Sequence, residues 1–168
     1  MTQQTTQVIL IRHGQTEWNK QRRMQGHSDS PLTEKGVLQA QLLGKRLATM
    51  SFDALYSSDS GRAHHTARCV AEATGHPLVV EPGLRERNFG VFEGLTREEM
   101  MERYPDDYAR FKARDPEFAM PNGESGVAFR ARAIACMDGL LARHAGQQIV
   151  VITHGLVLDV FYRLAMGI

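Results

Sequence analysis

The stretch Val8-Ile9-Leu10-Ile11-Arg12-His13-Gly14 decides the fold and locates the candidate site. Its four apolar residues are typical of a strand that is buried in a parallel sheet. Arg12, His13 and Gly14 then lie at the carboxyl end of that strand, which is the edge where open α/β sheets bind ligands. A cation and an imidazole beside a glycine, which allows close backbone approach, favour an anion site, with an ordinary strand-to-loop junction as the alternative.

The composition is that of an ordinary globular chain, and we expect residues 1–168 to form one domain. Of the 168 residues, 42% are hydrophobic and 23% are charged, and the net charge is +1. Because so small a net charge gives no general attraction to nucleic acid or to a membrane surface, an anion site must be a local cluster of cations. Cys69 and Cys136 lie far apart in helix-like sequence, and we expect buried thiols rather than a disulfide or a metal pair.

The sequence shows no targeting or membrane-spanning pattern. Residues 1–6 are polar and contain no apolar signal region. No apolar run approaches the roughly 20 residues that a membrane span requires. We therefore expect a cytoplasmic protein whose partner is a small molecule, and neither nucleic acid nor a membrane.

Apolar runs alternate with helical patterns along the chain. Strands are predicted at residues 8–11, 54–57, 78–80 and 148–153, and helices after Thr33 and Ser125 and at about 60–74, 96–103, 106–113 and 156–165. This alternation predicts an α/β fold of three layers, a mostly parallel sheet with helices on both faces. In the helix after Ser125, the predicted buried stripe is Val127, Ala131, Ile134, Met137 and Leu141.

Two more strand ends carry groups that suit an anion. Arg62 follows the second strand near a helix N-terminus, and Thr153-His154-Gly155 follows the fourth. Because parallel strands end at one edge of a sheet, Arg12, His13, Arg62 and His154 can converge there. Two guanidinium groups, two imidazoles and helix N-termini suit a tetrahedral oxyanion such as phosphate. Taken singly, Arg62 could pair with a surface carboxylate, and His154 could cap a helix.

The chain lacks the motifs of the commoner phosphate enzymes. It has no GxxxxGK[ST] loop, and His64 and His65 diverge as neighbours on a helix, so we predict neither a P-loop NTPase nor a metal centre, and no cofactor. Arginines would neutralise charge instead, and His13, kept unprotonated by nearby cations, would be the nucleophile. Glu86, after the third strand, is the candidate acid, since a phosphate dianion would keep it protonated. Glu93 is a rival, which we interpret as a solvated loop carboxylate.

The order of these motifs resembles the histidine phosphatase superfamily, also called phosphoglycerate mutase-like. The resemblance rests on residues 12–19, Gln25-Gly26, residues 30–36, Ser57–Asp59 with Arg62 and Thr66-Ala67, Leu84–Glu86, residues 92–94, residues 121–125 and Thr153–Gly155. It covers essentially the whole chain, and its wording is similar to that of the small bacterial phosphatases.

The resemblance implies a role for each of the strand-end residues. His13 would become the phosphohistidine. Arg12, Arg62 and His154 would hold the phosphoryl oxygens and stabilise the transition state. Glu86 would be the proton donor and then the base that activates water.

The resemblance also implies the lining of the phosphate pocket. The remaining pocket residues would be Asn19, Gln25, Gly26 and Gly155, the two glycines through their backbone. Arg87 is a candidate contact for an acidic group of the substrate, as are Arg22, Arg23 and Arg97. Each of the four could instead be an ordinary surface arginine.

One feature departs from the family pattern. Members usually continue past the last helix with another strand and a tail, whereas Gly167-Ile168 follow directly on that helix here. We therefore expect a sheet with an unpaired edge and a thinner core. This would lower the stability or be compensated by a partner chain, for example in a homodimer.

Three functions are compatible with these observations. They are a metal-independent phosphomonoesterase with a phosphohistidine intermediate, a phosphoglycerate mutase, and a catalytically weak phosphate-binding or interaction protein. A mutase must keep water from the phosphohistidine with a closing lid, and the segment between Glu86 and Gly123 is short. A non-catalytic protein is expected to lack His13 or Glu86, and both are present. We therefore predict a phosphatase, whose substrate the sequence does not indicate.

Overall fold

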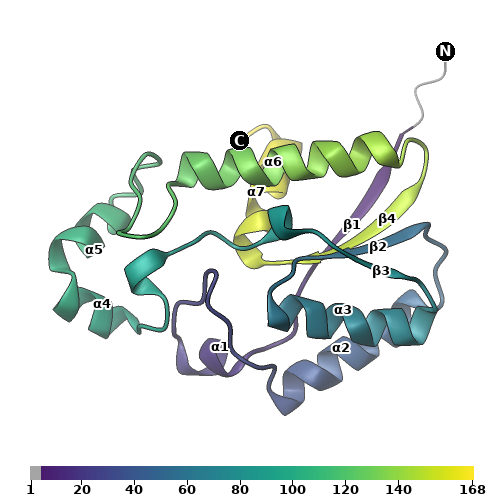
Figure 1. Ribbon diagram of the computed structural model, residues 1–168, viewed down its shortest axis with the longest axis horizontal. Coiled ribbons are helices and arrows are strands. Elements are labelled where there is room, and N and C mark those ends of the chain that lie inside the picture. Colours follow the sequence, from purple (N-terminus) through teal and green to yellow (C-terminus); the bar gives the residue numbers. More distant parts are fainter. Residues whose placement is uncertain (1–4) are drawn as a thin grey trace.

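A parallel sheet of four strands forms the middle layer of the computed structural model, which describes residues 5–168 (Figure 1). The strands are β1 (Gln7–Arg12), β2 (Ala54–Ser57), β3 (Leu78–Val80) and β4 (Gln148–Thr153), in the order β1-β4-β2-β3. Every strand pair is parallel, so the four carboxyl ends lie at one edge. The central strand β4 is buried from its second residue onward, as its continuous apolar run predicts.

Helices cover both faces of the sheet and complete the three predicted layers. α2 (Glu34–Leu47) and α3 (Gly61–Thr74) lie on one face, and α6 (Gly126–Arg143) and α7 (Gly155–Met166) lie on the other (Figure 1). The side chains of Thr33 and Ser125 cap α2 and α6 by accepting backbone N–H groups, as predicted. The predicted fold class is therefore confirmed.

Each face of the sheet has its own apolar core. The core under α2 and α3 consists of Leu47, Phe52, Leu55, Ala63, Ala67, Val70, Val150 and Ile152. The core on the opposite face consists of Tyr56, Leu84, Met137, Leu140, Ile149 and Val151. Alternate residues of β4 thus serve opposite cores, because successive side chains of a strand point to opposite faces.

The predicted buried stripe of α6 is wrong in phase. Its buried residues are Phe129, Ala133, Met137 and Leu140. Of the predicted stripe only Met137 is buried, and Val127 is 45% exposed. The phase is set by packing, because Phe129 is buried against Val157 and Val160 of α7.

A smaller apolar cluster lies away from the sheet and supports the loops around the candidate site. It is built from α4 (Arg97–Arg103), α5 (Pro105–Lys112) and the 3₁₀ turn η2 (Gly90–Phe92), which Figure 1 shows at the end of the molecule remote from the strands' beginnings. Its buried members are Phe89, Phe92, Met100, Phe118 and Met120. A second 3₁₀ turn, η1 (Pro82–Leu84), follows β3, and the short α1 (Glu17–Gln21) follows β1.

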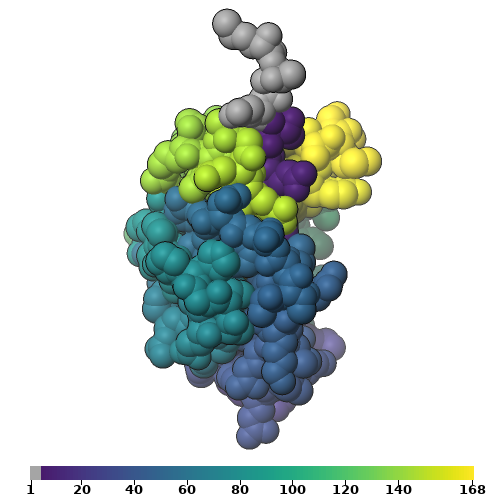
Figure 2. All heavy atoms as spheres, turned by 90° about the vertical axis from the view of Figure 1, so that its right-hand side faces the viewer, coloured from purple at the N-terminus to yellow at the C-terminus, as the bar shows by residue number. Residues whose placement is uncertain are grey.

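Figure 2 views the opposite end of the molecule, where the strands begin, and shows the start of β1 between the end of α6 and α7. Within residues 5–168, β1 pairs only with β4 and is an edge strand, so its apolar run is half-buried rather than buried as predicted. The effect of this open edge on stability stays a prediction. Cys69 and Cys136 are free thiols, as predicted, but are only half-buried. No helix in the described part of the chain has the length and apolar character needed to cross a membrane.

Candidate active site

A cavity of about 1090 Å³ opens at the carboxyl ends of the strands. It is lined by nine of the ten predicted site residues, namely Arg12, His13, Asn19, Gln25, Gly26, Arg62, Glu86, Arg87 and Gly155. The tenth, His154, lies directly behind the lining, with its ring centroid 5.3 Å from that of His13. The structure therefore brings all ten predicted residues together.

His13 follows β1 and is held as a neutral imidazole. Its Nδ1 lies 2.7 Å from the carbonyl oxygen of Gly14. Because a carbonyl can only accept, Nδ1 carries the proton, which leaves the lone pair on Nε2. Burial, aided by Arg62 and Arg12, lowers the pKa of His13 from 6.5 to about 4. The imidazole is therefore neutral at physiological pH, and Nε2 is its unprotonated nitrogen.

Arg62, in the first turn of α3, is fully buried beside His13 and firmly held. Its Nη1 donates to the Ser28 carbonyl at 2.9 Å and to Asp29 Oδ1 at 2.8 Å, and its Nη2 donates to the Gly26 carbonyl at 2.8 Å. Its Nε donates to His13 Nε2 at 3.3 Å. The guanidinium of Arg62 is thus held next to the unprotonated nitrogen of His13, Nε2.

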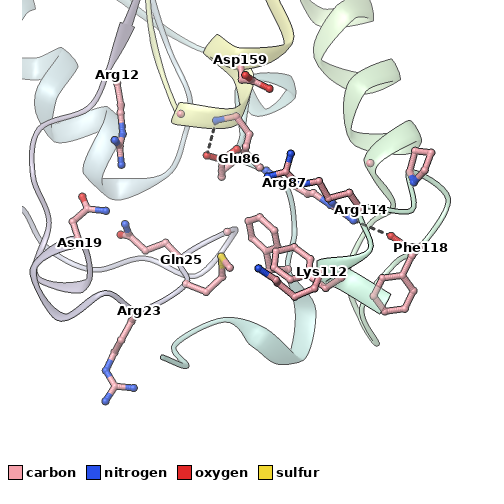
Figure 3. Close-up of a pocket in the computed structure, with 18 of the residues that line it drawn as sticks. Arg12, Asn19, Arg23, Gln25, Glu86, Arg87, Lys112, Arg114, Phe118 and Asp159 are labelled. Atoms are coloured by element: carbon pink, nitrogen blue, oxygen red, sulfur yellow. Dashed lines mark hydrogen bonds between the residues drawn. The ribbon is translucent and has the colours of Figure 1, made fainter. Parts of the chain in front are cut away.

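Glu86 lies across the cavity, at the N-terminus of α7. Its two carboxyl oxygens accept hydrogen bonds from the backbone N–H groups of Arg87 at 3.0 Å and Leu156 at 3.1 Å (Figure 3). Burial raises the pKa of Glu86, although both hydrogen bonds and the nearby arginines oppose the shift. The carboxyl group therefore holds its proton to a higher pH than an exposed glutamate.

Gly155 lies between the carboxyl group of Glu86 and the guanidinium of Arg12. A Cβ placed on Gly155 would lie 3.7 Å from Arg12 Nε and 4.0 Å from Glu86 Oε2. Figure 3 shows the side-chain ends of Arg12, Asn19 and Gln25 directed toward one another. Cationic and amide donors thus converge on one side of the cavity, with the carboxyl group of Glu86 at its edge.

His154 forms the N-cap position of α7 and is fully buried. Its Nε2 lies 2.9 Å from Ser58 Oγ, while its Nδ1 has no hydrogen-bond partner among residues 5–168. Burial, followed by the charges of Arg62, His13 and Arg12, lowers the pKa of His154 well below 6.5. A neutral imidazole with one unused nitrogen therefore lies next to His13.

The amide residues of the pocket are positioned by local hydrogen bonds. Asn19 Oδ1 accepts from Thr16 N in the capping box of α1. Gln25 Oε1 accepts from Thr16 Oγ1 at 3.0 Å. Because both oxygens are engaged, the N–H₂ groups are the parts of these side chains left for a ligand oxygen.

Arg87 supports the far wall of the cavity. Its Nε donates to the Glu124 carbonyl at 3.0 Å and its Nη2 to the Phe118 carbonyl at 2.8 Å. Two of its five N–H donors are therefore engaged by backbone carbonyls. Arg23 also lines the cavity, but its guanidinium pairs with Glu99. Arg22 and Arg97 are exposed and do not line the cavity, which agrees with the alternative that they are ordinary surface arginines.

The sequence interpretation of Glu93 needs correction, and that of Gly14 gains a specific partner. Glu93 is not a solvated carboxylate, because it accepts hydrogen bonds from His27 N, Ser28 N, Ser28 Oγ and Phe89 N and so joins two loops. The close backbone approach that Gly14 allows in the structure is to Gly36. A Cβ on Gly14 would lie 2.5 Å from the Gly36 carbonyl oxygen.

The model of the histidine phosphatase superfamily, branch 1, matches residues 8–168. This chain belongs to the histidine phosphatase superfamily. It is 40% identical over 167 residues to a protein of Yersinia pestis named "Probable phosphoglycerate mutase", covering 96% of this chain and 75% of that protein.

Two solved structures resemble this histidine phosphatase over most of its length. One is the alpha-ribazole phosphatase from Shigella flexneri, with a TM-score of 0.88 and 32% identity, over 96% of this chain and 80% of that one. The other is a mycobacterial glucosyl-3-phosphoglycerate phosphatase in complex with VO3, with a TM-score of 0.83 and 32% identity, over 95% and 79% of the two chains. The predicted family is therefore confirmed, and with it the prediction of an enzyme.

Several residues that hold this histidine phosphatase's site together have no role in the sequence analysis. Asp29 and Ser58 contact Arg62 and His154 directly. Arg132, on α6, donates to the carbonyls of Gly83, Arg85 and Glu86. A buried arginine requires an anionic partner, which was a usable signal for a carboxylate such as Asp29. Arg132 acts on backbone carbonyls, for which the sequence carries no signal.

Proposed function

We propose that this histidine phosphatase is a metal-independent phosphomonoesterase that acts through a phosphohistidine at His13. One observation carries the proposal. The Gly14 carbonyl accepts a hydrogen bond from the protonated Nδ1 of His13, so the lone pair is on Nε2, which faces Arg62 Nε at 3.3 Å. A neutral imidazole whose free nitrogen points at a fixed guanidinium is a nucleophile for an anionic phosphoryl group.

In the first step, His13 Nε2 attacks phosphorus and the bond between phosphorus and the ester oxygen breaks. The leaving oxygen takes the proton from Glu86, which holds that proton to a higher pH than an ordinary glutamate because burial raises its pKa. Arg12, Arg62 and the unused nitrogen of His154 would stabilise the negative charge on the phosphoryl oxygens.

In the second step, Glu86 is a carboxylate and accepts a proton from water. The water oxygen attacks phosphorus, the P–Nε2 bond breaks, and its electron pair returns to His13. Inorganic phosphate leaves, and Glu86 is protonated again. Both groups therefore end the cycle in the protonation states in which they began it.

Hydrolysis is supported over phosphate transfer by the size of the cavity. A volume of about 1090 Å³ leaves room for water beside a bound phosphoryl group. Mutase activity is the second candidate, because a relative that is 40% identical carries that name. A small phosphate ester is the proposed partner, and the cytoplasmic location stays a prediction.

The proposal is tested by assaying p-nitrophenyl phosphate hydrolysis in EDTA and by trapping the phosphoenzyme. We expect turnover in EDTA and a phosphoryl group that is acid-labile and base-stable, as on histidine. His13→Gln should abolish both, whereas His65→Gln, a change of the same type at an exposed position of α3, should change neither. Full activity in His13→Gln would overturn the mechanism. Absence of both turnover and phosphoenzyme would favour a phosphate-binding protein.

A separate assay distinguishes the phosphatase from the mutase. The enzyme is incubated with 3-phosphoglycerate, with and without the bisphosphate, and the products are quantified. We expect free phosphate from a hydrolase, whereas accumulation of the 2-isomer without free phosphate would assign a mutase.

A further inference from the structure

The cavity extends well beyond the proposed phosphate site. Pockets of about 300–1,000 Å³ hold drug-sized ligands, so a cavity of about 1090 Å³ is far larger than a phosphate group requires. The outer part has an apolar wall made by Met24, Phe89, Phe111 and Phe118. Because Phe89 and Phe118 are also buried in the apolar cluster under α4 and α5, this wall is a fixed surface.

Two cations lie on the rim of this outer part. Lys112 ends α5 and Arg114 follows it, and both are exposed residues that line the cavity. Figure 3 shows both on the side of the pocket that is remote from Arg12 and Asn19. The outer cations are therefore spatially separate from the cations of the proposed phosphate site.

Lys112 and Arg114 differ from the other cations near the outer cavity. Arg23 pairs with Glu99, and Arg163 pairs with Asp159. Within residues 5–168, neither Lys112 nor Arg114 forms an ion pair or a side-chain hydrogen bond. The adjacent Asp115 directs its Oδ1 to Glu117 N at 3.0 Å. The side chains of Lys112 and Arg114 are thus free to receive an anion, whereas Arg87 is held by the carbonyls of Glu124 and Phe118.

We propose that this outer region binds the alcohol part of the substrate, and that the substrate is a phosphate monoester of a bulky, partly apolar alcohol bearing a second anionic group. The inference rests on the proposed phosphatase function. The apolar body would pack on the wall that includes Phe89, Phe111 and Phe118. The second anion, for example a carboxylate, would lie between Lys112 and Arg114.

A pair of matched esters tests this inference: 2-naphthyl phosphate and 6-carboxy-2-naphthyl phosphate. The wild-type enzyme should have the lower KM for the carboxylated ester, and added salt should reduce the difference, because exposed charge pairs are screened. The double variant Lys112→Gln/Arg114→Asn removes both charges. Asparagine is chosen because position 114 has a φ of +57°, which asparagine tolerates well.

We expect this variant to raise KM for the carboxylated ester about 10-fold, from two exposed charge pairs, with kcat and the kinetics of 2-naphthyl phosphate unchanged. The control Arg97→Gln/Arg103→Asn makes the same charge change on exposed residues of α4 outside the cavity, and it should have no effect. Equal KM values for the two esters in the wild type, or equal effects of both double variants, would overturn the inference. Failure to hydrolyse either ester, with no phosphohistidine, would instead overturn the proposed function and this inference with it.

Discussion

The protonation states of His13 and Glu86 predict how kcat/KM depends on pH. Burial lowers the pKa of His13 to about 4, and burial raises the pKa of Glu86 above its ordinary 4.5. His13 must be neutral to attack phosphorus, and Glu86 must be protonated to donate to the leaving oxygen. Both conditions hold together between pH of about 4 and the raised pKa of Glu86. We therefore expect kcat/KM of the free enzyme to rise through a pH of about 4 and to decline as the pH passes the raised pKa of Glu86.

The magnitude follows from the neutral fraction of His13. With a pKa of about 4, roughly 90% of His13 is neutral at pH of about 5, compared with about 3% for a histidine of pKa 6.5. Lowering the pH from about 6.5 to about 5 should therefore change kcat/KM by less than about twofold through His13. An unshifted histidine would cause a fall of about 16-fold over the same interval.

The assay is kcat/KM for p-nitrophenyl phosphate between pH of about 4 and 8, corrected for ionisation of the ester. Glu86→Gln should lower kcat by about 10²- to 10⁴-fold and remove the alkaline decline, because the glutamine does not titrate. The imidazole of His13 can be titrated directly by ¹⁵N NMR. A midpoint for His13 near pH 6.5, or a steep loss of kcat/KM between pH of about 6.5 and 5, would show that burial does not lower the pKa of His13.

Three further changes test how the site is built. Asp29→Asn removes a carboxylate that lies 2.8 Å from Arg62 Nη1. Because the side chain of Asp29 is 38% exposed, we expect a moderate fall in kcat/KM of about 10-fold, a parallel loss of inorganic phosphate binding and little change in Tm. Unaltered kinetics would show that Arg62 is held in place without Asp29. Gly36→Ala would place a Cβ 2.0 Å from the Gln15 carbonyl oxygen, so urea denaturation should show a loss of about 3 kcal/mol or more, and a wild-type midpoint would contradict the close approach. In the unfolded chain His13 binds a proton below a pH of about 6.5, whereas in the folded protein it does so only near pH 4. The free energy of unfolding should therefore fall by about 3 kcal/mol as the pH is lowered from about 6.5 to about 4. His13→Gln should lose this part of the pH dependence.

The strands and the principal site residues could be predicted from the sequence for one physical reason. Continuous apolar runs identify β1 and β4 as parallel strands, of which β4 is buried and β1 only half-buried, and parallel strands bring their carboxyl ends to one edge. Arg12 is the last residue of β1, and His13 and His154 directly follow β1 and β4, so local patterns are sufficient to bring them together. Glu86 depended more on the family resemblance, because it lies in an irregular loop after β3.

Other features could not be predicted, because they depend on packing between distant segments. The buried face of α6 is set by Phe129 against α7, and no pattern within α6 separates it from the face that carries Val127. Glu93 was misjudged because loop carboxylates are usually solvated, whereas here two loops meet around its oxygens. The residues proposed to carry the chemistry could be predicted, whereas those that hold them in place could not.

The hydrogen bonds of Arg62 connect this support to the chemistry. A guanidinium has five N–H donors. In Arg62, Nη1 donates to the Ser28 carbonyl and to Asp29 Oδ1, and Nη2 donates to the Gly26 carbonyl. The Nε–H group donates to His13 Nε2. The Nε donor and the second Nη2 donor form the fork that an oxyanion accepts in bidentate fashion. If a phosphoryl group takes that fork, the Nε proton leaves His13 Nε2 and frees the lone pair that attacks. Phosphate binding and exposure of the nucleophile would then be one event, which explains why a buried imidazole can be both protected in the free enzyme and ready to react.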